Sequence, residues 1–204
     1  ADVAAMTRVI DELGERVVLV AASAPSYAHG VIDPITELAA IAQARGLRFH
    51  VDACIGGWVL PWLADVPAWD FAVPGVTSLS VDLHKYAYTP KGVSLLLHAN
   101  PQLRQPQFFA HADWPGYTML NSTTQSTKSG GPLAAAWAVV NLIGADGYRD
   151  LVARTVDATA EVARGIEAID HLHLVEQPET SLVVLGADDA LDVFTLSDLM
   201  LDRG

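Results

Sequence analysis

An uninterrupted apolar run, Val17–Ala22, is the feature that most limits how this 204-residue chain can fold. A strand whose residues are apolar on both faces is typical of a sheet that helices cover on both faces. Apolar residues at helical spacing precede this run over 2–14, and a second helix is predicted over 33–46. Buried strands that alternate with helices in this way predict a mainly parallel α/β sheet.

Further strand-like runs follow along the chain, over 47–53, 76–81 and 92–99. In parallel α/β sheets, ligands bind just outside the carboxyl ends of the strands. Asp52, His84 and Lys85 come at or shortly after the ends of the first two of these runs. We therefore expect these three side chains to converge at one edge of the sheet.

The last third of the chain predicts a helical layer followed by paired strands. Residues 132–143 are apolar nearly all round, which predicts a buried helix that ends at a break between glycines. A long amphipathic helix is then expected to reach about residue 169. The strands that follow it are predicted over 172–175 and 181–185.

Lys85 and Asp52 are the residues whose positions point to chemistry. Lys85 stands between His84 and Tyr86 and is either an ordinary surface cation or an amine with a lowered pKa that attacks carbonyl groups. Asp52 ends a strand, where a buried carboxylate is costly unless a cation meets it, although it could also cap a helix or a turn. A pyridinium nitrogen would be such a cation, and pyridoxal phosphate requires both a lysine and an acidic partner for its ring nitrogen.

Several short motifs occur in a fixed order along the chain, namely Ala24–Gly30, Val51–Gly57, Gly75–Ser78, His84–Tyr86, Pro90–Gly92, Asp113-Trp114 and Gly130-Gly131. In this combination the chain resembles the pyridoxal-phosphate-dependent decarboxylase family (group II). Within that family it looks most similar to the sphingosine-1-phosphate lyase-like branch. The resemblance covers residues 16–150 well and the remainder thinly.

The resemblance implies the pyridoxal-phosphate transferase fold type I. A mainly parallel large domain of the seven-stranded type, here partial, is expected over 1–150. The start of a small α+β C-terminal domain is expected over 151–204. The front of the large domain, which carries the ring that stacks on the cofactor, is expected to lie outside this chain.

The resemblance also implies roles for the residues at the predicted edge of the sheet. Lys85 would form the internal aldimine with pyridoxal 5′-phosphate, Asp52 would keep the ring nitrogen protonated, and Ala53 would be small because the ring lies against it. His84 would contact the cofactor phosphate or the substrate, unless it is an ordinary half-buried histidine. The expected catalytic residues are Lys85, Asp52 and His84, and the expected cofactor-binding residues are Asp52, Ala53, Ser80, His84, Lys85, Ser129 and Gly130.

Ser129 and Gly130 belong to the segment 126–132, directly before a predicted helix. Hydroxyls, glycines and free amides at a helix N-terminus favour an anion. In the family this segment approaches the phosphate from the neighbouring subunit, which implies a homodimer with a shared active site. Lys128 stands where relatives usually carry arginine, so an ordinary helix cap is the alternative.

The expected substrate pocket uses aromatic and histidine side chains from two loop segments. Tyr27 and His29 lie in the loop after the first predicted strand, at the same edge as Asp52. Trp114 and Tyr117 lie in an aromatic segment for which packing in the core is the alternative. The substrate residues are therefore predicted to be Tyr27, His29, Trp114 and Tyr117.

Composition and charge limit the possible partners. A net charge of −12 argues against nucleic acid and anionic membranes, and no apolar run approaches the roughly 18 residues that span a bilayer. The single cysteine, Cys54, suits a reducing cytoplasm, and the N-terminus lacks the pattern of a signal peptide. His50, Asp52 and Cys54 could share a strand face, but no second cluster completes a zinc-like ligand set, so no metal is predicted.

The predicted function is that of a pyridoxal-phosphate-dependent carbon–carbon lyase that acts on a small-molecule amine through Lys85. The run Val51–Gly57 favours cleavage of a phosphorylated 2-amino alcohol to an aldehyde and phosphoethanolamine, as the sphingosine-1-phosphate lyase-like branch implies. An amino-acid decarboxylase is the second interpretation and an aminotransferase the third. The remaining alternative is a catalytically inactive fragment or a structural subunit of such an enzyme.

Overall fold

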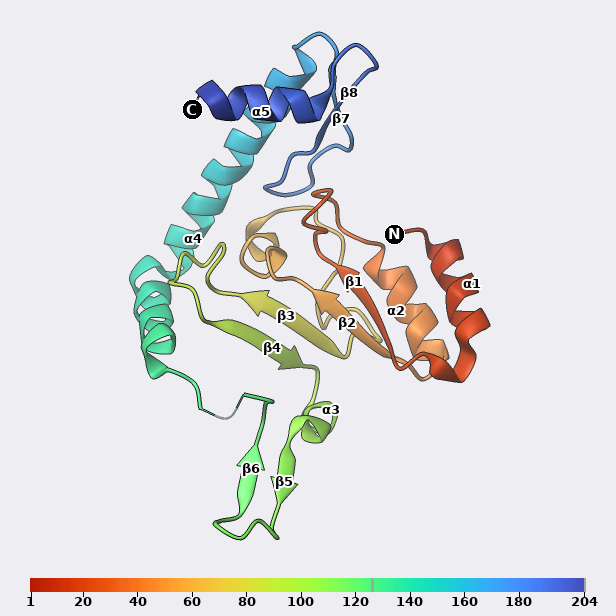
Figure 1. The fold of residues 1–204 in the computed structure, drawn as a ribbon, viewed down its shortest axis with the longest axis vertical. Helices are drawn as coiled ribbons and strands as arrows, with labels where there is room; N and C mark the ends of the chain where they lie inside the picture. The colour runs from red at the N-terminus through yellow and green to blue at the C-terminus, as the bar shows by residue number, and fades with distance from the viewer. Residues whose placement is uncertain (126, 204) are drawn as a thin grey trace.

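A computed structural model describes residues 1–125 and 127–203, and its centre is a four-stranded sheet in the order β1-β2-β3-β4 (Figure 1). The first three strands are parallel and the fourth runs antiparallel at the edge of the sheet. The prediction of a mainly parallel sheet is therefore confirmed, and the antiparallel direction of the last strand is a new feature. The strands are β1 (Leu19–Ser23), β2 (Arg48–Asp52), β3 (Ser78–Asp82) and β4 (Ser94–His98).

Of the two predicted N-terminal helices, α2 (Ile35–Ala44) packs beside β1 and β2, and α1 (Val3–Leu13) lies against α2 (Figure 1). The short helix η1 (Gly14–Arg16) follows α1. Asp2 caps α1 because its carboxylate accepts a hydrogen bond from the Ala5 amide at 2.9 Å. Gly14 ends α1 with a φ of 54°, a backbone conformation that favours glycine.

One face of the sheet is buried and the other is partly open. Val20, Phe49, Val51 and Leu79 point into the main core, where they pack with α1, α2 and the segments after β2. The neighbouring residues in each strand point the opposite way and are only partly buried. We call this second side the open face; from β2 to β4 it consists of Arg48, His50, Asp52, Ser78, Ser80, Asp82, Ser94, Leu96 and His98.

A tightly packed turn follows β2 and forms η2 (Gly56–Trp58) and η3 (Leu60–Trp62). A Cβ at Gly56 would lie 1.9 Å from the Ala24 carbonyl oxygen, which belongs to the backbone and cannot move cheaply. Only glycine therefore fits here, where the chain after β2 crosses the chain after β1.

Replacing Gly56 by alanine should lower the free energy of unfolding by about 3 kcal/mol, because the added methyl group overpacks a closed contact. Urea denaturation measures this change. Gly165→Ala is the matched control: nothing lies within 4 Å of the added Cβ, and alanine in a helix should be stabilising by roughly 0.5–1 kcal/mol. Equal stability of the Gly56 variant and the unsubstituted protein would contradict this packing.

The long helix α4 (Gly130–Glu167) crosses one end of the sheet and is kinked at Gly144, where φ is 64° (Figure 1). The predicted break between two helices is therefore present. Residues 132–143 do not form the predicted buried helix: Leu133, Trp137 and Leu142 are 60%, 71% and 85% exposed. The segment is apolar, but among the described residues no other element covers these three side chains.

The remaining elements extend away from the sheet. After β4 come α3 (Pro101–Arg104), η4 (Gln105–Gln107) and a projecting hairpin of β5 (Phe109–His111) and β6 (Met119–Asn121) (Figure 1). The C-terminal part contains the antiparallel pair β7 (Leu172–Leu174) and β8 (Leu185–Ala187) and the helix α5 (Val193–Arg203). The prediction of a strand over 181–185 is wrong in position, since pairing begins at Leu185.

The α+β character of this last part agrees with the predicted small domain. The domain boundary at residue 150 remains a prediction, and α4 runs through it without interruption. None of the helices in the described part of the chain is both long enough and apolar enough to cross a membrane.

Candidate active site

The carboxyl ends of the parallel strands bring polar side chains to one edge of the sheet. Asp52 and Asp82 are the last residues of β2 and β3. In the register of the sheet, Asp52 lies between Ser23 of β1 and Ser80 of β3. This is the edge where ligands bind in sheets of this class.

Asp52 is held as an ionised carboxylate. Its Oδ1 accepts hydrogen bonds from the Cys54 amide at 3.0 Å and from the Ser80 hydroxyl at 2.9 Å. Burial raises the pKa of Asp52, but these hydrogen bonds outweigh it, and the net effect holds the pKa below its ordinary value. Its other oxygen, Oδ2, accepts no hydrogen bond from a nitrogen or oxygen donor within the described residues.

Lys85 lies in the turn after β3, and its Nζ is 2.9 Å from Oδ2 of Asp82. The Ser94 hydroxyl also donates to the Asp82 carboxylate. Burial lowers the pKa of Lys85, but its contacts with Cys54 and Asp82 raise it more, so the net shift is upward. In the chain by itself, Lys85 is therefore an ion-paired ammonium and not an amine with a lowered pKa.

The turn that carries Lys85 is anchored to α4 by Tyr148. The buried Tyr148 hydroxyl donates to the Ala87 carbonyl oxygen at 2.9 Å. Its ring lies 4.8 Å from the Trp58 ring, centroid to centroid, and so joins α4 to the segment after β2. The turn is thus fixed from two sides, which keeps Lys85 near the ends of β2 and β3.

His84 is half-buried beside Lys85 and has a defined orientation. Its Nδ1 lies 3.1 Å from the Val93 carbonyl oxygen, which can only accept, so Nδ1 carries the proton. Its Nε2 faces Oδ2 of Asp82 at 3.7 Å. The structure therefore places the three predicted catalytic residues at one edge, with Asp82 between two of them.

Cys54 is a site residue that the sequence analysis did not assign. Burial raises the pKa of its thiol, and the neighbouring Lys85 ammonium offsets this in part. The thiol thus lies beside Lys85, while the Cys54 amide binds Asp52. Ala53, by contrast, is fully buried in the main core. In this structure Cys54, and not Ala53, is the small residue that faces the site.

The predicted phosphate-binding residues lie at the start of α4. Ser129 caps this helix, with its Oγ accepting from the Gly131 amide at 3.4 Å, and Gly130 is exposed. A Cβ on Gly92 would lie 3.3 Å from Pro132, so the start of α4 contacts the turn before β4. Ser126, in the same predicted segment, lies outside the described residues.

The four predicted substrate residues fall into two places. Tyr27 and His29 are exposed in the loop after β1, at the same edge as Asp52. Trp114 and Tyr117 are exposed in the loop of the β5–β6 hairpin, which projects from the body of the chain (Figure 1). This chain therefore does not bring Trp114 and Tyr117 to Lys85, and their role remains a prediction.

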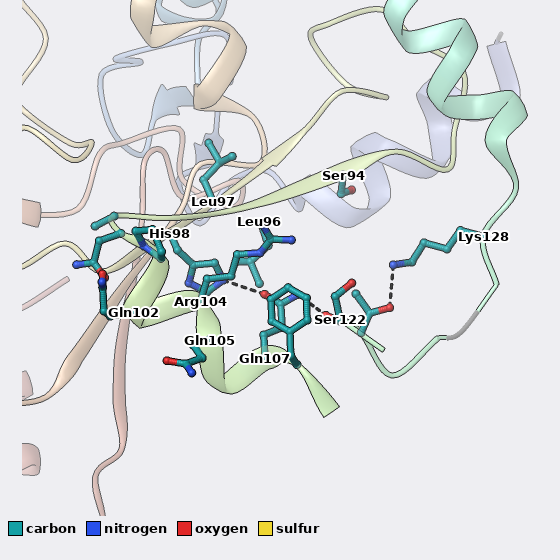
Figure 2. Close-up of a pocket in the computed structure, with 15 residues that line it drawn as sticks. Ser94, Leu96, Leu97, His98, Gln102, Arg104, Gln105, Gln107, Ser122 and Lys128 are labelled. Atoms are coloured by element: carbon teal, nitrogen blue, oxygen red, sulfur yellow. Dashed lines mark hydrogen bonds between the residues drawn. The ribbon is translucent and has the colours of Figure 1, made fainter. Parts of the chain in front are cut away.

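A cavity of about 920 Å³ lies next to this edge, but Asp52, His84 and Lys85 do not line it. Figure 2 shows β4 residues above the segment from Gln102 to Gln107. Ser122 lies next to Gln107, and Lys128 lies beyond Ser122. Lys128 donates to the Thr123 hydroxyl at 2.8 Å. Ser94, the partner of Asp82, is the link between this cavity and Lys85. Within the described residues, no group of three or more His, Cys, Asp or Glu side chains could hold a metal ion.

Comparison with known proteins agrees with this geometry. The family model described as the pyridoxal-dependent decarboxylase conserved domain matches residues 2–187. The sphingosine-1-phosphate lyase of Arabidopsis thaliana is 38% identical over 208 residues, which cover 100% of this chain and 38% of that protein. The chain thus spans well under half the length of this relative.

Solved structures give the same assignment of the fold. The sphingosine-1-phosphate lyase of Burkholderia pseudomallei superposes with a TM-score of 0.90 and 35% identity, over 99% of this chain and 46% of that one. The glutamate decarboxylase of Lactobacillus brevis superposes with a TM-score of 0.81 at 22% identity, over 96% and 47% of the two chains, and supports the fold alone. The predicted fold type I is confirmed, and pyridoxal phosphate is confirmed as the cofactor of the family that the motifs indicated. The chain belongs to the pyridoxal-dependent decarboxylase family.

Proposed function

We propose that this chain forms the cofactor-binding part of a pyridoxal-phosphate-dependent carbon–carbon lyase that acts on a phosphorylated 2-amino alcohol. The observation that carries the proposal is the position of Asp52 and Lys85 at the ends of neighbouring parallel strands, with Cys54 in contact with both. Asp52 would hold the ring nitrogen of the cofactor, and Lys85 would hold its aldehyde.

The residues at this edge suit the cofactor. Asp52 is ionised and keeps Oδ2 unused by other nitrogen or oxygen donors of the described chain, so it can accept a hydrogen bond from a protonated ring nitrogen. Lys85 would supply the amine that holds the cofactor's aldehyde group. Ser129 and Gly130, at the N-terminus of a long helix, suit the phosphate group.

When bound, pyridoxal phosphate supplies an acceptor for the electrons of the bond that breaks at the substrate's α-carbon. Asp52 would stabilise a positive charge on the ring nitrogen, because its carboxylate is ionised and Oδ2 is not used by other nitrogen or oxygen donors of the described chain. The Asp82 carboxylate forms an ion pair with the Lys85 ammonium and so holds Nζ at the edge of the sheet. His84, with Nδ1 fixed on the Val93 carbonyl, presents Nε2 as the group that can take up or give back a proton.

The aldehyde-lyase reaction is supported by the similarity to sphingosine-1-phosphate lyases along the whole chain. An amino-acid decarboxylase is the second candidate, and the name of the matching family favours it. Product analysis distinguishes the two. The full-length protein with cofactor should release an aldehyde and phosphoethanolamine from a phosphorylated 2-amino alcohol, and no carbon dioxide from α-amino acids.

Release of carbon dioxide alone would assign the decarboxylase reaction. If the full-length protein shows no absorbance band of bound cofactor after excess pyridoxal phosphate has been removed, the inactive or structural alternative holds instead.

A homodimer with a shared active site is part of the proposal. It is supported by Leu133 and Trp137, which are exposed, lie four residues apart and so share one side of α4, because soluble monomers rarely leave apolar patches uncovered. The projecting β5–β6 hairpin gives Trp114 and Tyr117 a way to reach the partner's site. A cytoplasmic location is proposed from the single cysteine, Cys54, which is a free thiol.

Trp137→Glu should weaken the dimer by about 30-fold or more, because a buried aromatic anchor would become a charge. Sedimentation or light scattering across a dilution series measures this shift. Val162→Glu is the control, since Val162 is a similarly exposed apolar residue in the other half of α4. An unchanged dimer in the Trp137 variant would remove this side of α4 from the interface.

A further inference from the structure

His50 has no role in the function proposed above, yet it lies in a continuous hydrogen-bond chain with Asp52. In the sheet register His50 pairs with Ser78 and Asp52 pairs with Ser80, so the four side chains share the open face. His50 Nδ1 lies 2.9 Å from the Ser78 Oγ, and His50 Nε2 lies 3.2 Å from the Ser80 Oγ. The Ser80 Oγ lies 2.9 Å from Asp52 Oδ1.

The chemistry of Asp52 and a neutral His50 ring together fix the direction of every hydrogen bond in this chain. An ionised carboxylate only accepts, so the Ser80 hydroxyl must donate to Asp52. The Ser80 oxygen is then left to accept, and His50 must carry its proton on Nε2. If the ring is neutral, His50 Nδ1 is unprotonated and accepts from the Ser78 hydroxyl.

The charged and titratable groups around His50 agree with a neutral ring. Burial lowers the pKa of His50, Asp52 on the same strand raises it, and His98 on β4 lowers it. Cys54 is the titratable neighbour of Asp52 after β2. The net shift is downward, so the imidazole is neutral at pH 7.

We infer that neutral His50, through Ser80, is a positioning residue that orients the Asp52 carboxylate. Ser80 and the Cys54 amide both bind Oδ1, which turns Oδ2 toward the ligand side of the edge. The carboxylate thus has one oxygen committed to the protein and one kept for a ring nitrogen. Only the role of Oδ2 toward a ring nitrogen rests on the proposed function. The hydrogen-bond chain itself needs no cofactor.

The first test is nitrogen NMR of histidine-labelled, cofactor-free protein at pH 7. The chain contains seven histidines, and His50→Gln assigns the His50 signals. We expect a protonated Nε2 and an unprotonated Nδ1 for His50. In Ser80→Ala the preference for the Nε2 tautomer should be lost, and Ser80→Thr should retain it. An Nδ1-protonated or doubly protonated His50 would overturn the inference.

The second test follows the cofactor. In Ser80→Ala the affinity for pyridoxal phosphate should fall about tenfold, since a hydrogen bond to a charged group is lost. The pKa of Asp52 should rise without this donor, so loss of bound-cofactor absorbance on acidification should begin at higher pH than in the unsubstituted protein. Ser80→Thr should restore both values. Unchanged affinity and an unchanged acid limb in Ser80→Ala would overturn the positioning role.

These outcomes separate the inference from the proposed function. If the unsubstituted protein binds no pyridoxal phosphate, the proposed function fails, whereas the tautomer of His50 in the cofactor-free protein still decides the hydrogen-bond chain. If the cofactor binds and His50 has the other tautomer, the proposed function stands and the inferred hydrogen-bond chain is wrong.

Discussion

Lys85→Ala is expected to abolish covalent binding of pyridoxal phosphate and to reduce turnover by about 10⁴-fold or more. Lys85 is the amine that the structure holds at the carboxyl edge of the sheet, ion-paired with Asp82 and next to Cys54. Removing a nucleophile that forms a covalent bond to the cofactor has effects of this order or larger. The measurement is the visible absorbance of the full-length protein with added cofactor, followed by borohydride reduction and mass spectrometry of the labelled peptide.

Lys91→Ala provides the matched control. Lys91 is a nearby exposed lysine in the turn before β4, and it contacts neither Asp52 nor Asp82 among the described hydrogen bonds and ion pairs. It should keep both the absorbance and the label on Lys85. A partly exposed ion pair such as Lys85–Asp82 contributes no more than about 1 kcal/mol, so the Lys85 variant should fold normally. A cofactor label that persists in Lys85→Ala would show that another lysine is the anchor.

The order of elements could be predicted because the strands carry strong one-dimensional signals. The run 47–53 became β2 at Arg48–Asp52, and the Asp2 cap and Gly14 end of α1 are both present. The direction of β4 was not predicted, although a signal existed. Parallel strands need a crossover of a dozen or more residues, usually with a helix, and the connection from β3 to β4 is residues 83–93, which contain no helix.

The buried helix over 132–143 shows the limit of composition. An apolar sequence predicts that a surface will be covered, but it does not say by which partner. In this chain Trp137 remains exposed, and the surface that would cover it belongs to no described element. Positions of this kind therefore mark interfaces better than they mark the core of the chain itself.

The relation between Asp52 and its neighbours shows what spacing can and cannot supply. Period-two alternation puts Cys54 on the same side as Asp52, as expected from the sequence, and Ala53 on the other, as the structure has them. The contact of His50 with Ser80 could not be predicted, because it depends on the register between two strands that are far apart in the sequence. Register is set by packing in three dimensions and has no local signal.

Asp52→Asn is expected to reduce turnover by about 10³-fold while leaving the fold intact. The asparagine has the same shape, and its oxygen can still accept from the Cys54 amide and the Ser80 hydroxyl. It cannot carry the negative charge that stabilises a protonated ring nitrogen, and a preorganised charge in a site contributes effects of this size. Steady-state kinetics of the full-length protein, with cofactor at saturation, measures the loss.

Stability should respond to pH in a way that identifies the same charge. The pKa of Asp52 is lower in the folded chain than its ordinary value, so ionised Asp52 stabilises the fold above the pKa of the unfolded chain. This contribution disappears as the pH falls through the lower, folded pKa. The difference in unfolding free energy between the unsubstituted protein and Asp52→Asn should therefore be largest near pH 7 and shrink in acid.

Asp70→Asn is the control for this pair of measurements, because Asp70 also accepts a hydrogen bond from the amide two residues further on, at 2.8 Å, yet lies away from the site. It should change neither turnover nor its pH dependence. A cofactor analogue methylated on the ring nitrogen carries a fixed positive charge, so it should restore part of the activity of Asp52→Asn. If the analogue gives no recovery and Asp52→Asn loses no more activity than Asp70→Asn, Asp52 is a turn carboxylate and the ring nitrogen binds elsewhere.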